Sequence, residues 1–168
     1  MAKITIEEIL LLQGQGLTQA EIARRAGVTR QYIYKLLRES GYRSEFALQT
    51  RLIRNNFPWE LENNEVMDNT VYIQLWLAAR FNHNPASISK TSTERVRALI
   101  RKLVRFHQVI DYDPHYPWVK GLFNTRGLAF LPRSLTDENY MIKIRPGVTL
   151  TEVGKTLWQM PDLKELRL

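Results

Sequence analysis

Cysteine is absent from the 168 residues of this chain. Disulfide bonds and thiolate metal sites are therefore excluded, and a reducing compartment suits such a sequence. No apolar stretch approaches the roughly 20 residues that a membrane-spanning helix needs. The first residues do not read as a secretory signal, because the short apolar run Leu10–Leu12 follows two glutamates. We therefore expect a cytoplasmic protein without a membrane span.

Groups that could carry catalysis are sparse. The three histidines lack the spacing of a metal site, and no cysteine could complete one; they are His83, His107 and His115. His107 instead continues an apolar helix face, which favours a packed or capping residue. Asp111 and Asp113 alternate along a predicted strand, but the third carboxylate that a recombinase-type metal site would need is missing. The sequence therefore predicts a protein that is not an enzyme and has no cofactor and no metal site.

The net charge of +7 is unevenly distributed. Residues 1–40 carry a net +2 and residues 91–110 a net +4, whereas residues 61–70 carry a net −3. Two basic blocks on either side of an acidic segment favour a polyanionic partner. The chain length suits one or two small domains.

Residues 19–36 have the pattern of a helix-turn-helix. Ala23 is small enough for two helices to cross closely, and Gly27 tolerates the positive φ of the turn. Thr18 with Glu21 predicts a capping box for the first helix, and Thr29 predicts an N-cap for the second. The positions expected to share a core are Ile22, Ala26, Val28, Ile33 and Leu36.

The outward face of the second of these helices carries long donors, an amide and an aromatic ring. If Ile33 and Leu37 face inward, then Gln31, Tyr34, Lys35 and Arg38 face outward, with Arg30 at the leading edge. Arginine can pair with guanine and glutamine with adenine in the major groove of DNA. Gln19, at the start of the preceding helix, suits a phosphate contact. The alternative is a helical hairpin that touches no nucleic acid.

Residues around this motif complete a three-helix head. A first helix is predicted from Thr5, in a capping box with Glu8, to Gly14 or Gly16, and the head closes at Gly41. A further helix from Ser44 is stopped by Pro58. We therefore predict a helix-turn-helix domain over residues 1–42, a linker helix over 43–56 and a C-terminal α+β domain over 57–168.

A second basic helix is predicted within the C-terminal domain, after the buried helix Val71–Phe81. It starts at a capping box of Thr91 and Glu94, and Val96, Leu99, Ile100, Leu103, Val104 and His107 form its core face. The cations that we expect to contact DNA here are Arg95, Arg97, Arg101 and Lys102, and Arg105 lies on the same basic side. Like charges four residues apart repel each other, which favours an anionic partner. A merely solvated basic face is the alternative.

Short β-like runs follow at Val109–Tyr112, Gly127–Leu131 and Tyr140–Ile144. A helix followed by a β-ribbon is typical of a winged helix, in which Asn124–Gly127 would be the wing tip and Arg126 would contact phosphate. A last helix is predicted over Leu150–Met160, with a capping box of Thr149 and Glu152. The fold class predicted is mainly α with a small β part.

Several longer motifs resemble a known family. They are VTRQ (Val28–Gln31), NFPWE (Asn56–Glu60), IDYDP (Ile110–Pro114), FLPRSLTDE (Phe130–Glu138) and LTEVGKTLWQMP (Leu150–Pro161). In this order and spacing they resemble the immunity repressors of temperate actinobacteriophages, in particular mycobacteriophages. The resemblance runs over nearly the whole chain. It implies DNA contacts at Gln19 and at residues 29–35, which adds Thr29 and Tyr32 to the predicted site.

The resemblance implies a repressor that keeps a prophage silent in its bacterial host. It would bind operator DNA and many scattered, asymmetric stoperator sites as a monomer. The sequence itself supports a non-palindromic site, because it carries a second basic element of different character, so that two unlike domains of one chain could read the DNA. A palindrome-reading dimer is not indicated, because the sequence shows no heptad seam. Two other functions stay open: a DNA-targeting protein of a recombination or transposition system, and a regulator whose C-terminal domain binds protein instead of DNA.

Overall fold

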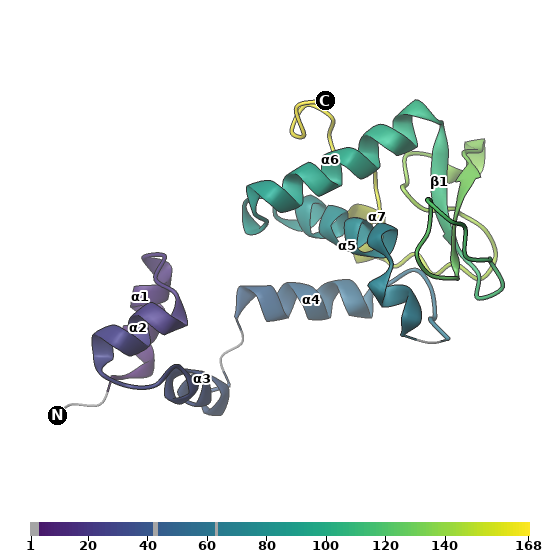
Figure 1. Cartoon of the computed structure of the whole chain (residues 1–168). Coiled ribbons are helices and arrows are strands. Elements are labelled where there is room, and N and C mark those ends of the chain that lie inside the picture. Colours follow the sequence, from purple (N-terminus) through teal and green to yellow (C-terminus); the bar gives the residue numbers. More distant parts are fainter. Residues whose placement is uncertain (1–3, 42–43, 63) are drawn as a thin grey trace. The chain divides into compact units, whose positions relative to one another are not determined.

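The computed structural model describes residues 4–41, 44–62 and 64–168. It divides into two compact units, Met1–Leu48 and Gln49–Leu168. The border falls inside helix α4 (Glu45–Asn55), while the predicted boundary between residues 42 and 43 lies outside the described residues. Helices dominate both units, and two strands form a small sheet in the second (Figure 1). The predicted fold class, mainly α with a small β part, is confirmed.

The first unit contains three short helices: α1 (Ile6–Gly14), α2 (Gln19–Ala26) and α3 (Arg30–Glu39). The predicted caps are present at all three N-termini. Thr5 and Thr18 form capping boxes with Glu8 and Glu21, and the Thr29 hydroxyl accepts from the Tyr32 amide at 3.1 Å. Each cap satisfies an amide that the first turn of a helix leaves without a partner, so these local sequences define where the helices start.

The core of this unit is small. Ile9 from α1, Ile22 from α2 and Ile33 from α3 are fully buried against one another, together with Ala23 and Leu37. The turn between α2 and α3 depends on Gly27, which caps α2 with φ of 65°. In that conformation the Val28 amide donates to the Ala23 carbonyl at 2.9 Å and closes the helix end.

Replacing Gly27 with valine is expected to destabilise the first unit by about 1–3 kcal/mol, because a β-branched residue is strained at positive φ. The space around the glycine is open, so the cost comes from the backbone and not from a clash. Hydrogen exchange of the amides of α2 and α3 in the full chain measures the loss. Gly27→Asn is the control, since asparagine tolerates this conformation. Equally slow exchange in wild type and the valine variant would contradict the prediction.

The second unit is built around a pair of helices. Its elements after α4 are η1 (Glu65–Asp68), α5 (Thr70–His83), η2 (Pro85–Ser87), α6 (Lys90–Arg105), β1 (Gln108–Tyr112), β2 (Leu128–Pro132), η3 (Leu135–Asp137) and α7 (Glu152–Leu157). Helices α5 and α6 pack side by side, with α7 against α5 (Figure 1). Leu75 of α5, Ile100 of α6 and Trp158 after α7 are fully buried in their shared core. The predicted buried helix Val71–Phe81 is thus present.

The sheet is antiparallel, with Ile110 opposite Phe130. The third predicted strand, Tyr140–Ile144, does not form. Only one bridge joins it to β1: the Ile110 amide donates to Met141 at 2.9 Å, and the Lys143 amide donates to Ile110 at 2.8 Å. The neighbouring amides of Met141 and Ile144 turn to other acceptors, the Trp158 carbonyl and the Asp137 carboxylate. Its hydrogen bonds are thus shared among three partners instead of one ladder.

Two predicted capping boxes in this unit are wrong, each by two residues. Helix α6 is capped by Ser89, whose hydroxyl accepts from the Ser92 amide, and not by Thr91. Helix α7 is capped by Thr151, and not by Thr149, and is shorter than the predicted Leu150–Met160. The amide of Thr149 donates instead to the Pro58 carbonyl, which holds this residue outside the helix.

Four of the five motifs that carry the family resemblance, all except Val28–Gln31, lie in this unit and contribute to its core. Asn56 joins distant segments, because its side chain accepts from the Thr151 hydroxyl at 2.7 Å and its carbonyl accepts from the Trp158 indole at 2.8 Å. The Asp111 carboxylate, fully buried on β1, accepts from Tyr116 and Arg145, each at 2.8 Å. These polar groups therefore have hydrogen-bond partners within the fold of the second unit.

The Asp137 carboxylate stabilises the second unit in a pH-dependent way. Burial raises its pKa, but the amides of Ile144 and Ser134, with the Lys143 ammonium, outweigh this and lower the pKa from 3.8 to about 2. Because the folded-state value is depressed, this stabilisation is complete above the unfolded pKa, near 4, and is lost as pH falls towards 2.

In Asp137→Asn, about 2 kcal/mol of stability should be missing at neutral pH, and the fall between pH 4 and 2 should be shallower than in wild type. Urea unfolding of the full chain, followed by tryptophan fluorescence at each pH, measures both. Parallel curves for the two proteins would show that Asp137 does not carry this pH dependence.

Candidate nucleic-acid interface

Four of the predicted DNA-contacting residues line one open groove of about 390 Å³ on the first unit: Gln19, Arg30, Gln31 and Tyr34. Gln19 starts α2, and the other three lie on the first turns of α3. The capped turn at Gly27 and Thr29 sets the two helix N-termini against this groove. Amide and guanidinium donors beside a half-exposed aromatic ring suit the edges of DNA bases and the adjacent phosphates.

The outward face of α3 continues from this groove along the helix. Ile33 and Leu37 are buried, so Gln31, Tyr34 and Lys35 lie on the opposite side, where all three are exposed, as Arg38 is one turn further on. Tyr32 lies at the flank of the helix and is half-buried. The face thus presents side chains that the core does not use.

Acidic residues near this face do not block it. Glu39 pairs with Lys35 at 3.8 Å, but both side chains are more than half exposed, and such surface pairs contribute about 0–1 kcal/mol. Glu21 is occupied by the capping box, where hydrogen bonds from Thr18 lower the pKa of its carboxyl. Lys35 can therefore exchange Glu39 for a base or a phosphate at little cost.

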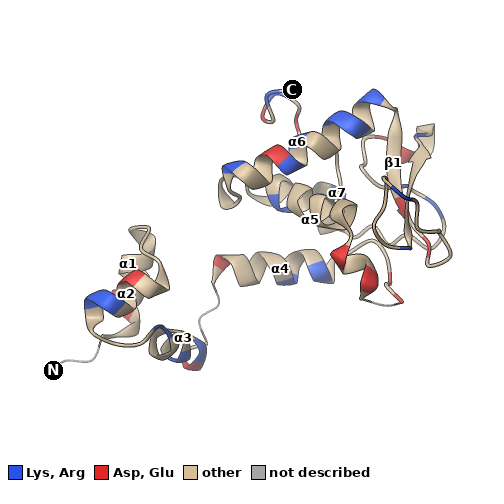
Figure 2. Ribbon diagram, viewed as in Figure 1, with Lys and Arg blue, Asp and Glu red and all other residues tan. Residues whose placement is uncertain are grey.

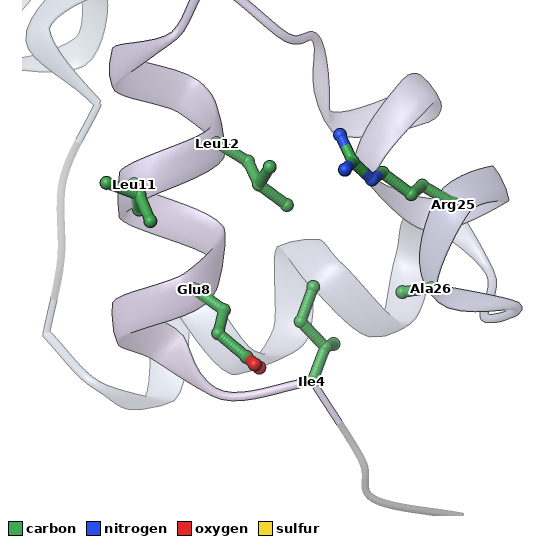
Figure 3. A pocket seen from close by; sticks show the side chains of 6 residues that line it. All are labelled: Ile4, Glu8, Leu11, Leu12, Arg25 and Ala26. Carbon is green, nitrogen blue, oxygen red and sulfur yellow. The ribbon is translucent and has the colours of Figure 1, made fainter.

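A second hollow of the first unit, of about 330 Å³, lies between α1 and α2 (Figure 3). Its lining is mostly apolar, with one acid and one base: Ile4, Glu8, Leu11, Leu12, Arg25 and Ala26. None of these residues belongs to α3, so this hollow is separate from the outward face of α3.

In the second unit, basic residues recur along α6 (Figure 2). The core side of this helix is Val96, Leu99, Ile100 and Leu103, as predicted, but Val104 and His107 are exposed. The helix ends at Arg105, and His107 follows with φ of 53°, which turns it off the core face. Arg95, Arg101 and Arg105 are exposed on the opposite side, and no ion pair joins any of them to an acidic residue of the described part of the chain.

Two of the predicted contact residues on α6 have partners inside the protein. Arg97 donates to the Leu166 carbonyl and pairs with Glu94, so it holds the C-terminal segment against the helix. Lys102 is half-buried with its ammonium 4.1 Å from the centre of the Phe130 ring, and this burial lowers its pKa. Of the five basic residues considered on this helix, Arg95, Arg101 and Arg105 are thus the ones that are exposed to solvent.

The segment predicted as a wing tip is anchored instead. The Asn124 side chain accepts from the Thr70 amide and donates to the Asp68 carbonyl, each at 3.1 Å, at the start of α5. Thr125 is buried, and its hydroxyl accepts a hydrogen bond from the side-chain amide of Asn69 at 2.9 Å. Arg126 lies between two buried residues but is itself exposed. It can therefore reach a phosphate, although Asn124–Gly127 does not form a free tip.

Within residues 4–41, 44–62 and 64–168, no group of three or more histidine or acidic residues is arranged to hold a metal ion. Among the helices of that same part of the chain, none has the length and apolar character to cross a membrane.

Comparison with known proteins agrees with the geometry of the first unit. Residues 6–44 match the family model described as helix-turn-helix. Over 95% of its length, the chain is 26% identical to a repressor-like immunity protein of Mycobacterium phage L5, and the match covers 85% of that protein. The first unit is thus a helix-turn-helix domain, and the similarity to the phage protein extends through the second unit.

Proposed function

We propose that this chain is a sequence-specific, double-stranded-DNA-binding repressor that maintains phage lysogeny and superinfection immunity. The groove formed by Gln19, Arg30, Gln31 and Tyr34 carries this proposal, because it sits on the recognition side of a helix-turn-helix. The similarity to the repressor-like immunity protein supports the biological role. The regulator acts by occupying DNA and not by catalysis.

The site is read by two domains of one molecule. Helix α3 reads bases in the major groove, and the exposed cations of α6 contact the phosphates of the same duplex. Two unlike contact surfaces match a site without two-fold symmetry. The chain therefore binds operator and stoperator sites as a monomer in the cytoplasm of the bacterial host.

A regulator whose second unit binds protein remains a second candidate, favoured by one observation. Val104 and Phe106 are more than half exposed at the end of α6, where they line a hollow of about 550 Å³ with Leu163 and Leu168. Its rim is nevertheless basic, with Arg101 and Arg105, which favours a polyanion.

Selection of bound duplexes from a random pool, followed by a reporter assay with the selected sequence, tests the proposal. The full chain should enrich one asymmetric sequence and repress a promoter that overlaps it. Enrichment of no sequence, with unaltered reporter expression, would overturn it.

A further inference from the structure

The connection between β1 and β2 exposes a group of apolar side chains. Trp118 is 53% exposed, Val119 41% and Leu122 42%. They occupy a tight turn in which the amides of Leu122 and Phe123 both donate to the Val119 carbonyl, at 3.0 and 2.9 Å. Gly121 supplies the positive φ, 77°, that this turn requires. We call Trp118–Leu122 the apolar tip.

Residues on both sides of the apolar tip in sequence anchor it to the rest of the second unit. Phe123 is buried, with its ring 5.0 Å from that of Phe130. On the preceding side, the Tyr116 hydroxyl donates to the buried Asp111 carboxylate at 2.8 Å, and its carbonyl accepts from Gly127 at 3.0 Å. The exposure of Trp118 with its apolar neighbours on a well-anchored turn indicates a surface that binds another molecule.

The charge around the tip indicates what covers it. The sequence contains no aspartate or glutamate between Asp113 and Asp137, whereas Lys120 and Arg126 are both exposed there. At the base of this connection, the Asn124 side chain donates a hydrogen bond to the Asp68 carbonyl of the acidic segment η1. An apolar wedge with one cation within it, Lys120, and another shortly after it in sequence, Arg126, matches duplex DNA, whose phosphates surround an apolar stack of bases.

The tip is also joined to the basic helix. Phe130 contacts both, because its ring packs on Phe123 and lies under the Lys102 ammonium. The base of the apolar tip and α6 therefore pack against the same residue, so that both can meet the same duplex.

We propose that the apolar tip is a minor-groove wedge, in which Trp118 and Leu122 press between base pairs while Lys120 and Arg126 hold the flanking phosphates. This rests on the proposed DNA-binding function and adds to it a deformation of the DNA. Wedges of this kind unstack a base step and kink the duplex by about 20–90°. Flexible pyrimidine–purine steps would then be preferred at a position that α3 does not touch.

The test uses the full chain and a duplex selected from a random pool by the wild-type protein, with donor and acceptor dyes at its ends. Wild type should raise energy transfer on binding, because the kink brings the ends together. In Trp118→Ala and Leu122→Ala this rise should be lost or greatly reduced, and Trp118→Ala should weaken binding about tenfold. Leu135→Ala is the matched control, since Leu135 is a 98% exposed leucine of the same unit.

Tryptophan emission gives a second readout. Of the four tryptophans, Trp59 and Trp158 are buried and Trp76 is half-buried, so the more exposed Trp118 should dominate the quenching by acrylamide in the free protein. Bound DNA should shield Trp118 from the quencher. Trp118→Phe should keep the kink but lose this shielding signal. Wild-type binding with no kink, or a kink that survives Trp118→Ala, would overturn the wedge alone. If DNA affinity and energy transfer are unchanged in all tip variants, the apolar tip binds a protein partner and not DNA. If the wild-type chain binds no duplex, the proposed DNA-binding function itself is overturned.

Discussion

Replacing Gln31 and Lys35 together with alanine is expected to weaken binding to the selected duplex about 100-fold, with nearly unchanged binding to random DNA. Each lost base contact costs about 1–3 kcal/mol. Both side chains are exposed on α3 and take no part in its core, so the fold should be retained. Non-specific binding comes mainly from phosphate contacts, which the double variant leaves largely intact.

Fluorescence anisotropy with the selected and a scrambled duplex measures the two affinities. Gln15→Ala is the control, because Gln15 is an exposed glutamine of the same unit at the end of α1. Equal losses on both duplexes would mean that these residues contact phosphates only. Wild-type affinity for both would contradict the assignment of α3 as the recognition helix.

Replacing Arg95, Arg101 and Arg105 with alanine is expected to reduce the dependence of affinity on salt. Each phosphate contact contributes about 0.9 to the slope of log K against log salt concentration on B-DNA. Loss of three contacts should therefore remove about 2–3 units from the slope. The three residues face away from the core of α6, so the melting temperature should stay close to that of wild type.

Titrations of the full chain at several salt concentrations give the slope. A variant with Lys155 and Lys164 replaced by alanine removes charge elsewhere on the second unit and should keep the wild-type value. If the arginine variant folds and its slope is unchanged, the basic side of α6 is a solvated face. Arg97 is left out of this set, since its loss would release the C-terminal segment at Leu166.

Local signals made the first unit predictable. Caps at Thr5, Thr18 and Thr29 and the turn at Gly27 depend on residues within four positions, so the sequence contains all the determinants. The second unit shows where such signals fail. Ser89 and Thr91 could each cap α6. The structure caps the helix at Ser89, although Thr91 with Glu94 matches the sequence pattern of a capping box. Competing candidates of this kind are decided by packing outside the segment.

The candidate site shows the same division. The outward face of α3 follows from helical spacing alone. The contact of Arg97 cannot be predicted from helical spacing, because its partner Leu166 lies 69 residues away in sequence. Asn124 is similar, since its contacts at the start of α5 are 54 and 56 residues distant. The apolar tip had one signal in the sequence, the long stretch without an acidic residue around Trp118, which only the exposure of its side chains made meaningful.

Native mass spectrometry of the full chain on the selected duplex, with hydroxyl-radical footprinting of the same complex, measures whether one molecule contacts an asymmetric site with both units. We expect one chain per duplex and two unlike protected segments, of which one is lost in the Arg95, Arg101 and Arg105 variant. Two chains per duplex with a symmetric footprint on a palindrome would contradict this expectation.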